Sequence, residues 1–224
     1  IKFADVKKIE LVDDKKIVKT KNEEFICDNV IVATGRNPRE LLLPHEKELI
    51  GHGISYCALC DGSFYKDKDV AIVGGGNSAL GEALYLSSIC HKVYLIHRRD
   101  EYRAASNLIN TVKEKQNIEL ITNSNITKLN EKDGYLNSII INDNKQINVS
   151  CVFIYIGNTP DISFLDNLNL TTKDDYIIVN NDMETNIKGI YACGDVIYKN
   201  TYQLTTAVGE ATVAANSIIK QGNM

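Results

Sequence analysis

Short apolar runs recur along this chain, separated by polar turns or by longer segments of mixed character. They lie at residues 29–33, 70–73, 93–97, 118–122 and 151–156. Runs of this length are typical of strands that are buried on both faces of a parallel sheet. Between them, residues 77–90 and 106–115 carry apolar positions at the spacing of amphipathic helices. The strand–helix–strand unit over 70–97 is therefore expected to have a right-handed crossover.

In other parts of the chain, short strand-like segments are separated by polar turns, which predicts antiparallel strands. Residues 1–33 are rich in β-forming residues, with strands on either side of Asp13-Asp14. Segments 126–129, 135–141 and 147–149 are separated by turn residues and predict a three-stranded meander. Strands at 176–179 and 190–192 and a helix over 205–220 complete the expected elements.

Two of the buried runs end in the same signal. The run at 30–34 leads into Gly35-x-x-Pro38, and the run at 151–156 leads into Gly157-x-x-Pro160. Such turns are typical of boundaries, and the repetition suggests two related halves. We expect a discontinuous domain of residues 1–36 and 158–224, with a second domain of residues 37–157 inserted into it.

Composition narrows the class of protein without choosing a function. The chain has 224 residues, of which 44% are hydrophobic and 24% are charged, and its net charge is −4. These values are ordinary for a globular protein and give no reason to expect nucleic acid as a partner. No apolar run approaches the length of a membrane span, and no secretory signal is present, so we expect a cytoplasmic protein. Because the chain begins at Ile1 without an initiator Met, we expect a fragment or a processed product.

A glycine turn follows the strand at 70–73. Gly74, Gly75 and Gly76 are followed by Asn77, Ser78 and Ala79, which gives the pattern Gly-x-Gly-x-x-Ala between a strand and a helix. Such a turn brings the backbone close to a pyrophosphate and presents the N–H groups of the helix N-terminus to it. The strand before the turn and the helix after it favour a dinucleotide site over a purely structural turn.

The end of the next strand indicates which dinucleotide binds. An NAD site places an acidic residue about 20 residues after the turn, but here the strand ends in His97-Arg98-Arg99, with Arg103 just beyond. Guanidinium groups pair with a 2′-phosphate, whereas a carboxylate repels it. The sequence therefore favours NADP(H) over NAD(H).

A dithiol motif precedes the turn, at Cys57-Ala58-Leu59-Cys60, and Asp61 follows it directly. A Cys-x-x-Cys pair in a reducing compartment is more often catalytic or metal-binding than structural. Cycling between thiol and disulfide would give Asp61 a role in proton exchange. A zinc site made with His45 and His52 is the alternative, but the irregular spacing disfavours it and we expect no metal.

Four motifs in this order resemble bacterial-type, low-molecular-weight thioredoxin reductase. They are Cys57-Ala-Leu-Cys60-Asp61-Gly62, the turn at Gly74–Ala79, the basic cluster from His97 to Arg103, and Tyr191-Ala-Cys-Gly-Asp-Val196. The resemblance implies a Rossmann-like, three-layer NADPH domain inserted in an FAD-binding domain, in a homodimer. It also implies that electrons pass from NADPH to FAD, then to the Cys57–Cys60 disulfide, and finally to thioredoxin.

The resemblance assigns roles to individual residues as well. Cys60 would be the thiol beside the flavin, Cys57 would attack thioredoxin, and Asp61 would act as acid and base. Gly157 would join the NADP site. The FAD contacts would be Thr34, Gly35, Gly194, Asp195, Gln203 and Leu204. Tyr202 stands where the family usually has Arg, which alters a contact near the flavin or NADPH.

One family motif is missing from this sequence. The first FAD motif is a glycine-rich turn after an N-terminal strand, yet no glycine precedes Gly35. We therefore identify the chain as an N-terminally truncated member and expect it to bind FAD weakly or not at all. Two alternatives stay open: a related flavoprotein reductase that serves a peroxiredoxin or a ferredoxin, and an NADPH-binding fragment without catalysis.

Overall fold

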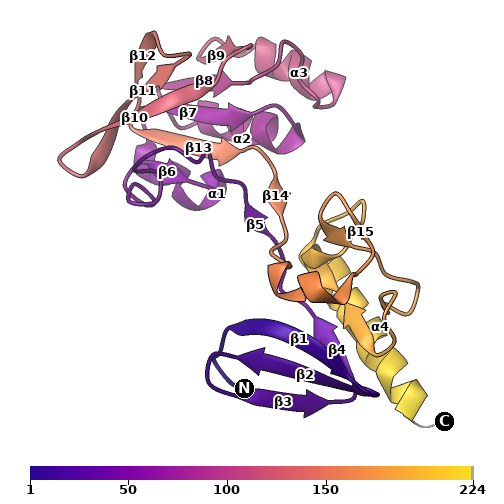
Figure 1. Ribbon diagram of the computed structural model, residues 1–224. Coiled ribbons are helices and arrows are strands. Elements are labelled where there is room, and N and C mark those ends of the chain that lie inside the picture. The colour runs from indigo at the N-terminus through magenta and orange to yellow at the C-terminus, as the bar shows by residue number, and fades with distance from the viewer. Residues whose placement is uncertain (223–224) are drawn as a thin grey trace. The chain divides into compact units, whose positions relative to one another are not determined.

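The computed structural model describes residues 1–222. The chain divides into two compact units (Figure 1). Unit 2 is Pro38–Asn158, and unit 1 consists of Ile1–Asn37 together with the residues from Thr159 onward. The chain passes between the units through two short strands that pair with each other, β5 (Asn37–Pro38) and β14 (Asn158–Thr159).

Both crossings follow a glycine in the left-handed backbone region. Gly35 has a φ angle of 70° and Gly157 a φ angle of 105°, conformations that favour glycine because it has no Cβ. The repeated Gly-x-x-Pro signal in the sequence thus marks the two places where the chain leaves one unit for the other.

Unit 2 is built on a five-stranded parallel sheet. Its order is β6 (Ile54–Ser55), β13 (Cys151–Tyr155), β7 (Asp69–Gly74), β8 (Lys92–Ile96) and β9 (Ile118–Ile121). The helical segments of this unit are α1 (Ala58–Asp61), the 3₁₀ segment η1 (Gly62–Tyr65), α2 (Asn77–Ser87) and α3 (Ser106–Lys113). A three-stranded antiparallel meander of β10 (Ile126–Lys132), β11 (Tyr135–Ile141) and β12 (Lys145–Asn148) completes it.

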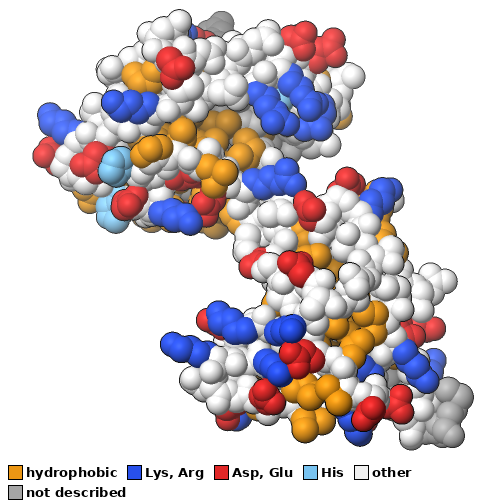
Figure 2. Space-filling view, viewed as in Figure 1, with side chains coloured by type: hydrophobic (Ala, Val, Ile, Leu, Met, Phe, Trp, Pro, Cys, Tyr) orange, Lys and Arg blue, Asp and Glu red, His pale blue; other side chains and the backbone are white. Residues whose placement is uncertain are grey.

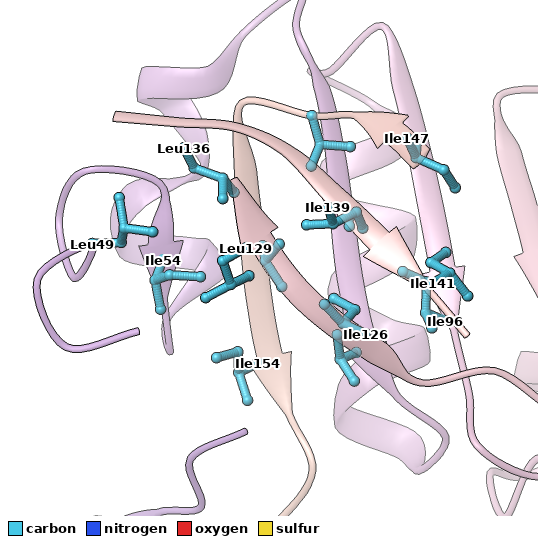
Figure 3. Packing of buried hydrophobic residues seen from close by; sticks show 14 residues of the cluster. Leu49, Ile54, Ile96, Ile126, Leu129, Leu136, Ile139, Ile141, Ile147 and Ile154 are labelled. Atoms are coloured by element: carbon cyan, nitrogen blue, oxygen red, sulfur yellow. The ribbon is translucent and has the colours of Figure 1, made fainter. Parts of the chain in front are cut away.

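The sheet of unit 2 is buried on both faces. Successive side chains of its strands point to opposite faces and join two different cores. On β7, Val70 and Ile72 join the core under the helices, while Ala71 and Val73 join the core under the meander. Figure 3 shows this second core, which combines meander residues such as Ile139 with sheet residues such as Ile154. The predicted three-layer architecture of this part of the chain is confirmed.

Unit 1 combines several small sheets with a long helix. An antiparallel sheet contains β1 (Val6–Val12), β2 (Lys15–Thr20) and β3 (Glu24–Cys27), and a parallel pair contains β4 (Val30–Val32) and β17 (Ile190–Ala192). The remaining elements are η2 (Ser163–Leu168), β15 (Thr172–Lys173), β16 (Tyr176–Ile177), η3 (Gly194–Val196) and α4 (Leu204–Gly222). Their shared core includes Ile9, Val32, Leu165 and Ile190.

The expected strands and helices occur close to their predicted positions, except that the strand expected at 176–179 covers only Tyr176–Ile177 and one helix ends early. The helix predicted to reach Cys90 ends at Ser87. The hydroxyl groups of Ser87 and Ser88 donate to the carbonyl oxygens of Leu84 and Tyr85. Such side-chain bonds to the backbone compete with helix continuation in the last turn. None of the helices in residues 1–222 is long and apolar enough to cross a membrane.

Candidate active site

The two cysteines of the Cys-x-x-Cys motif are joined in a disulfide, with their Cα atoms 5.3 Å apart. Cys57 caps the N-terminus of α1, and its Sγ accepts the backbone N–H of Cys60 at 3.2 Å. Cys60 is exposed and Cys57 is half-buried. An amide that donates to sulfur favours a thiolate over a thiol.

Polar groups hold the short helix that carries the disulfide. The buried Ser55 hydroxyl donates to Asp61 Oδ2 at 2.7 Å and accepts the Cys57 N–H at 3.1 Å. The Ala58 N–H donates to the Tyr155 hydroxyl at 2.8 Å. Because Tyr155 ends β13 and Ser55 ends β6, both contacts attach the helix to the central sheet.

The alternative of a zinc site finds no support in this geometry. Both cysteines are used by the disulfide. Across residues 1–222, no group of three or more His, Cys, Asp or Glu side chains is arranged to hold a metal ion.

A cavity of about 830 Å³ lies within unit 2 at the carboxyl ends of the parallel strands. In open α/β sheets this is where nucleotides bind. Its lining contains most of the predicted nucleotide residues, namely Gly74, Gly75, Gly76, Asn77, Ser78, His97, Arg98, Arg103 and Gly157. Tyr56, which directly precedes Cys57, and Tyr155 line it too, so the cavity extends to the residues around the disulfide.

The glycines of the turn serve different purposes. A Cβ on Gly74 would lie 2.5 Å from the Tyr155 carbonyl oxygen, and one on Gly75 would lie 2.2 Å from the imidazole of His97. These two glycines are therefore required by close packing. Gly76 caps the N-terminus of α2 and has open space around it. A side chain at position 76 would therefore contact no protein atom and would interfere only with a bound ligand. This agrees with a pyrophosphate at the helix N-terminus.

The basic cluster is divided by the fold. All three arginines are exposed; Arg98 and Arg103 line the cavity, and Arg99 does not. The backbone N–H of Arg103 donates to the Gly75 carbonyl oxygen at 2.7 Å, which holds Arg103 beside the glycine turn. In the space-filling view, Lys and Arg side chains gather over the side of unit 2 that carries α2 and α3 (Figure 2). Of the three predicted arginines, two therefore line the cavity.

His97 has a supporting position under the turn. Its ring is buried, stacks on Tyr102 with centroids 5.2 Å apart, and makes a 3.1 Å contact from Nε2 to the Glu101 carbonyl oxygen. Burial lowers the pKa of His97 below its usual value, and Arg103, Arg99 and Arg98 lower it further. A neutral imidazole leaves the positive charge of the cavity to the arginines.

The predicted flavin residues lie in unit 1. Thr34 and Gly35 follow β4, and Gly194 and Asp195 follow β17; because these two strands are parallel neighbours, both loops lie at the same edge. Asp195 Oδ2 lies 3.2 Å from Nε of Arg36, and the Arg36 guanidinium lies 4.0 Å from the centre of the Tyr202 ring. Gln203 precedes α4, and Leu204 begins it.

Comparison with known proteins places this chain in a family. The family model described as "Pyridine nucleotide-disulphide oxidoreductase" matches residues 2–213. The chain belongs to the pyridine nucleotide-disulphide oxidoreductase family. The fold class and the resemblance expected from the sequence are confirmed by this match and by the relatives.

Several relatives of this member of the pyridine nucleotide-disulphide oxidoreductase family are named thioredoxin reductase. The chain is 37% identical to thioredoxin reductase of Bacillus subtilis over 223 residues, covering 96% of this chain and 70% of that protein. It is 45% identical to thioredoxin reductase of Buchnera aphidicola over 215 residues, covering 89% and 65% respectively. The crystal structure of Lactococcus lactis thioredoxin reductase superposes with a TM-score of 0.81 at 36% identity, covering 97% of this chain and 73% of that one. The chain thus spans 70% of the length of the Bacillus subtilis protein and 65% of the length of the Buchnera aphidicola protein.

Sequence patterns did not identify several residues that shape the site of this family member. The buried Glu46 carboxylate accepts the Tyr56 hydroxyl at 3.0 Å and the Leu41 N–H at 2.8 Å, which fixes one wall of the cavity. In unit 1, Glu210 Oε2 accepts the Gly194 N–H at 2.9 Å and pairs with Lys199 at 2.8 Å. Glu46 gave no signal in the sequence, because an isolated Glu in a loop normally faces solvent.

Tyr155 was missed as well, although its position did carry a signal. It ends a buried parallel strand, and the carboxyl ends of such strands are where ligands bind. Its hydroxyl contacts the first residue of α1, Ala58.

Proposed function

We propose that this chain performs the dithiol chemistry of an NADPH-dependent disulfide reductase that acts on thioredoxin. One observation carries the proposal. The Cys57–Cys60 disulfide and a dinucleotide cavity lined by Arg98 and Arg103 belong to the same compact unit. A reductase driven by NADPH needs both parts, and the sequence relatives named thioredoxin reductase support this choice of partner.

In this proposal the nucleotide is NADPH, held by the cavity of unit 2. Its pyrophosphate would meet Gly76 and the N–H groups of Asn77 and Ser78 at the start of α2. Arg98 and Arg103 would bind the 2′-phosphate. Arg99 was predicted to share this role, and its place outside the cavity lining supports a minor one.

The flavin would bind unit 1. Two loops at the edge of a parallel strand pair, at Thr34-Gly35 and Gly194-Asp195, fit part of a dinucleotide site. A Cβ on Gly35 would meet no atom within 4 Å, so the loop has room for a ligand beside it. Gln203 and Leu204 would lie on the ring side, as the resemblance implies. FAD would supply the two-electron link between the nicotinamide and the disulfide.

Disulfide exchange at the dithiol transfers two electrons to thioredoxin in this proposal. In the reduced form, the Cys57 thiolate attacks a sulfur of the thioredoxin disulfide, which breaks that bond and forms a mixed disulfide. Cys60 then attacks Cys57, which restores the Cys57–Cys60 disulfide and releases thioredoxin with both sulfurs reduced. Asp61 accepts the proton of the Cys60 thiol and returns it to the leaving thiolate. The Cys60 N–H on Cys57 Sγ supports Cys57 as the first nucleophile.

The proposal extends to a homodimer in the cytoplasm, as the resemblance implies. Analytical ultracentrifugation tests the first part. A concentration-independent monomer would contradict a dimer.

Electron transfer from the reduced chain to oxidised thioredoxin tests the proposal without added cofactors. The chain is reduced with dithiothreitol, desalted and mixed with oxidised thioredoxin, and thioredoxin thiols are counted by mass spectrometry after alkylation. We expect two new thiols per thioredoxin, and none with Cys57→Ser. Failure of the unaltered chain to reduce thioredoxin would overturn the choice of substrate.

The alternative interpretation, in which the chain only binds nucleotide, makes a different prediction. It expects NADPH binding by calorimetry together with a dithiol that does not react with thioredoxin. The placement of Asp61 and of an amide donor at the disulfide favours the redox interpretation over it.

A further inference from the structure

We infer that Ser55 is a positioning residue, which holds the Asp61 carboxylate beside the Cys57–Cys60 pair while the disulfide opens and closes. This inference rests on the proposed function, in which Asp61 handles the proton of the dithiol. It adds the group that keeps Asp61 in place.

The Ser55 hydroxyl contacts both ends of the redox motif. It is 2.7 Å from Asp61 Oδ2, 3.1 Å from the Cys57 nitrogen and 3.3 Å from the Cys57 carbonyl oxygen. A hydroxyl has one proton to donate. The shorter contact, to the carboxylate, takes that proton, and the Cys57 N–H donates to an oxygen lone pair. One side chain therefore links the backbone of the first cysteine to the carboxylate that follows the second.

This anchor comes from the sheet and not from the helix. The α1 helix has only four residues, and a single turn gains little stability from its own hydrogen bonds. Ser55, by contrast, is 4% exposed and pairs with Phe153 of β13 in the parallel sheet. When the bond between the two sulfurs breaks, the turn loses a covalent link, while the contact from Ser55 to Asp61 does not depend on that link.

A second contact to α1 makes it possible to distinguish two roles of Ser55, namely stabilising the α1 turn and positioning the Asp61 carboxylate. The Tyr155 hydroxyl accepts the Ala58 N–H and therefore restrains α1 through its backbone, whereas the hydrogen bond to the Asp61 carboxylate comes from Ser55. If Ser55 only stabilised the turn, losing Ser55 or losing the Tyr155 hydroxyl would have similar consequences. If Ser55 acts through Asp61, the effect of losing the Ser55 hydroxyl on the exchange rate requires Asp61 to be present. The effect of losing the Tyr155 hydroxyl does not.

The experiment measures the second step of disulfide exchange on the full chain, without nucleotide, flavin or thioredoxin. Reduced protein is mixed with glutathione disulfide, quenched in acid, and the mixed disulfide is followed by mass spectrometry. Resolution of that mixed disulfide needs the Cys60 proton to leave. We expect Ser55→Ala to slow resolution about tenfold, a part of the contribution of a positioned general base. In an Asp61→Asn background, Ser55→Ala should change the rate less than about twofold, because effects within one unit are not additive.

Four further variants control for folding and for loosening of the turn. Ser55→Thr keeps the hydroxyl and should resolve near the unaltered rate, while Ser55→Val has the shape of threonine without the hydroxyl and should be slow. This pair replaces Ser55→Ala if alanine unfolds the protein. Tyr155→Phe should change the rate of resolution by the same factor in the unaltered chain and in the Asp61→Asn background. Ser138→Ala removes another buried hydroxyl of unit 2, whose partner is Asn130, and should leave resolution unchanged.

Equal slowing by Ser55→Ala in both backgrounds would overturn the inference, and so would no slowing. An unaltered rate in Asp61→Asn alone would also overturn it, because Ser55 would then have no proton carrier to position. These results are independent of thioredoxin and NADPH. Failure of the thioredoxin assay together with the expected coupling would reject the proposed substrate and leave the role of Ser55 intact.

Discussion

At the scale of single residues, two adjacent glycines of the nucleotide turn are expected to differ in their roles. Gly75 is required for protein stability, and Gly76 for nucleotide binding. A Cβ at residue 75 would collide with the buried His97 ring, whereas a Cβ at residue 76 would meet nothing within 4 Å. Gly75→Ala should destabilise the protein by about 1–3 kcal/mol through overpacking and weaken NADPH binding. Gly76→Ala should keep its stability but lose NADPH affinity, because its methyl group would occupy the pyrophosphate position.

Urea denaturation and calorimetry measure the two effects separately. Full NADPH affinity in Gly76→Ala would contradict a pyrophosphate at this turn. Unchanged stability in Gly75→Ala would show that His97 moves away without cost.

The three arginines should differ in their effect on cofactor choice. Arg98 and Arg103 line the cavity, and Arg99 does not. Replacing Arg98 or Arg103 with Ala should weaken NADPH about tenfold or more, since hydrogen bonds between charged groups contribute about 1.5–3 kcal/mol. NADH, which lacks the 2′-phosphate, should be affected less than about twofold. Calorimetric titration with both nucleotides measures this, and Arg99→Ala is the matched control.

Equal losses for NADPH and NADH would contradict recognition of a 2′-phosphate by these side chains. A loss in Arg99→Ala as large as in Arg103→Ala would support the sequence prediction that all three arginines bind the 2′-phosphate together.

Sequence patterns pointed to the contiguous motifs of the candidate site and missed the residues that hold these motifs in place. The dithiol, the glycine turn and the basic cluster are contiguous motifs whose spacing carries their chemistry, so they could be named from sequence. Tyr155, by contrast, contacts Ala58 across 97 positions of the chain. Such a contact depends on which strands become neighbours, and strand order is not encoded in local periodicity.

At the scale of elements, the segment before the dithiol is held by one buried carboxylate. Glu46 is 2% exposed and accepts the N–H groups of Leu41 and Leu43 and the hydroxyl of Tyr56. Burial raises the pKa of the Tyr56 hydroxyl, and its hydrogen bond to Glu46 raises that pKa further. Leu41 and Tyr56 both line the cavity, so Glu46 connects this loop to the residue beside Cys57.

Removing this carboxylate should therefore destabilise unit 2. Glu46→Ala leaves two backbone donors and one hydroxyl without their acceptor, at a cost of about 2–4 kcal/mol. Glu48→Ala, two residues away and exposed, should lie within about 0.5 kcal/mol of the unaltered protein. Urea denaturation followed by circular dichroism compares them. Equal stabilities of the two variants would contradict a structural role for Glu46.

The long elements of the fold were predictable because their apolar periodicity is strong. The parallel strands at 70–73 and 93–97 and the meander were expected from the apolar pattern alone, and the structure has them as β7, β8 and β10 to β12. The two-residue strand β6 and the four-residue helix α1 were not predicted. Elements this short have no period to detect, and β6 exists only because β13 offers it an edge.

At the scale of the whole molecule, the two units differ in how complete their nucleotide sites are. Unit 2 contains a glycine turn, a helix N-terminus and arginines around one cavity. Unit 1 contains two loops that fit part of a flavin site, but no glycine precedes Gly35 in the sequence. We therefore predict that the 224-residue polypeptide binds NADPH and retains little FAD.

Incubation with FAD, followed by gel filtration and an absorbance spectrum, tests this prediction. A yellow protein fraction with one flavin per chain would contradict it. Calorimetric titration of the same sample with NADPH is the control, since binding there shows that unit 2 is folded.

Trapping of the exchange intermediate tests the central claim most directly. Cys60→Ser retains the proposed nucleophile and removes the thiol that resolves the mixed disulfide. With a thioredoxin that has lost its own resolving cysteine and is activated as a mixed disulfide with thionitrobenzoate, this variant should form a stable covalent complex through Cys57, visible by non-reducing electrophoresis and mass spectrometry. A complex formed by Cys57→Ser instead, or by neither variant, would contradict the account of Cys57 as the residue that passes electrons to thioredoxin.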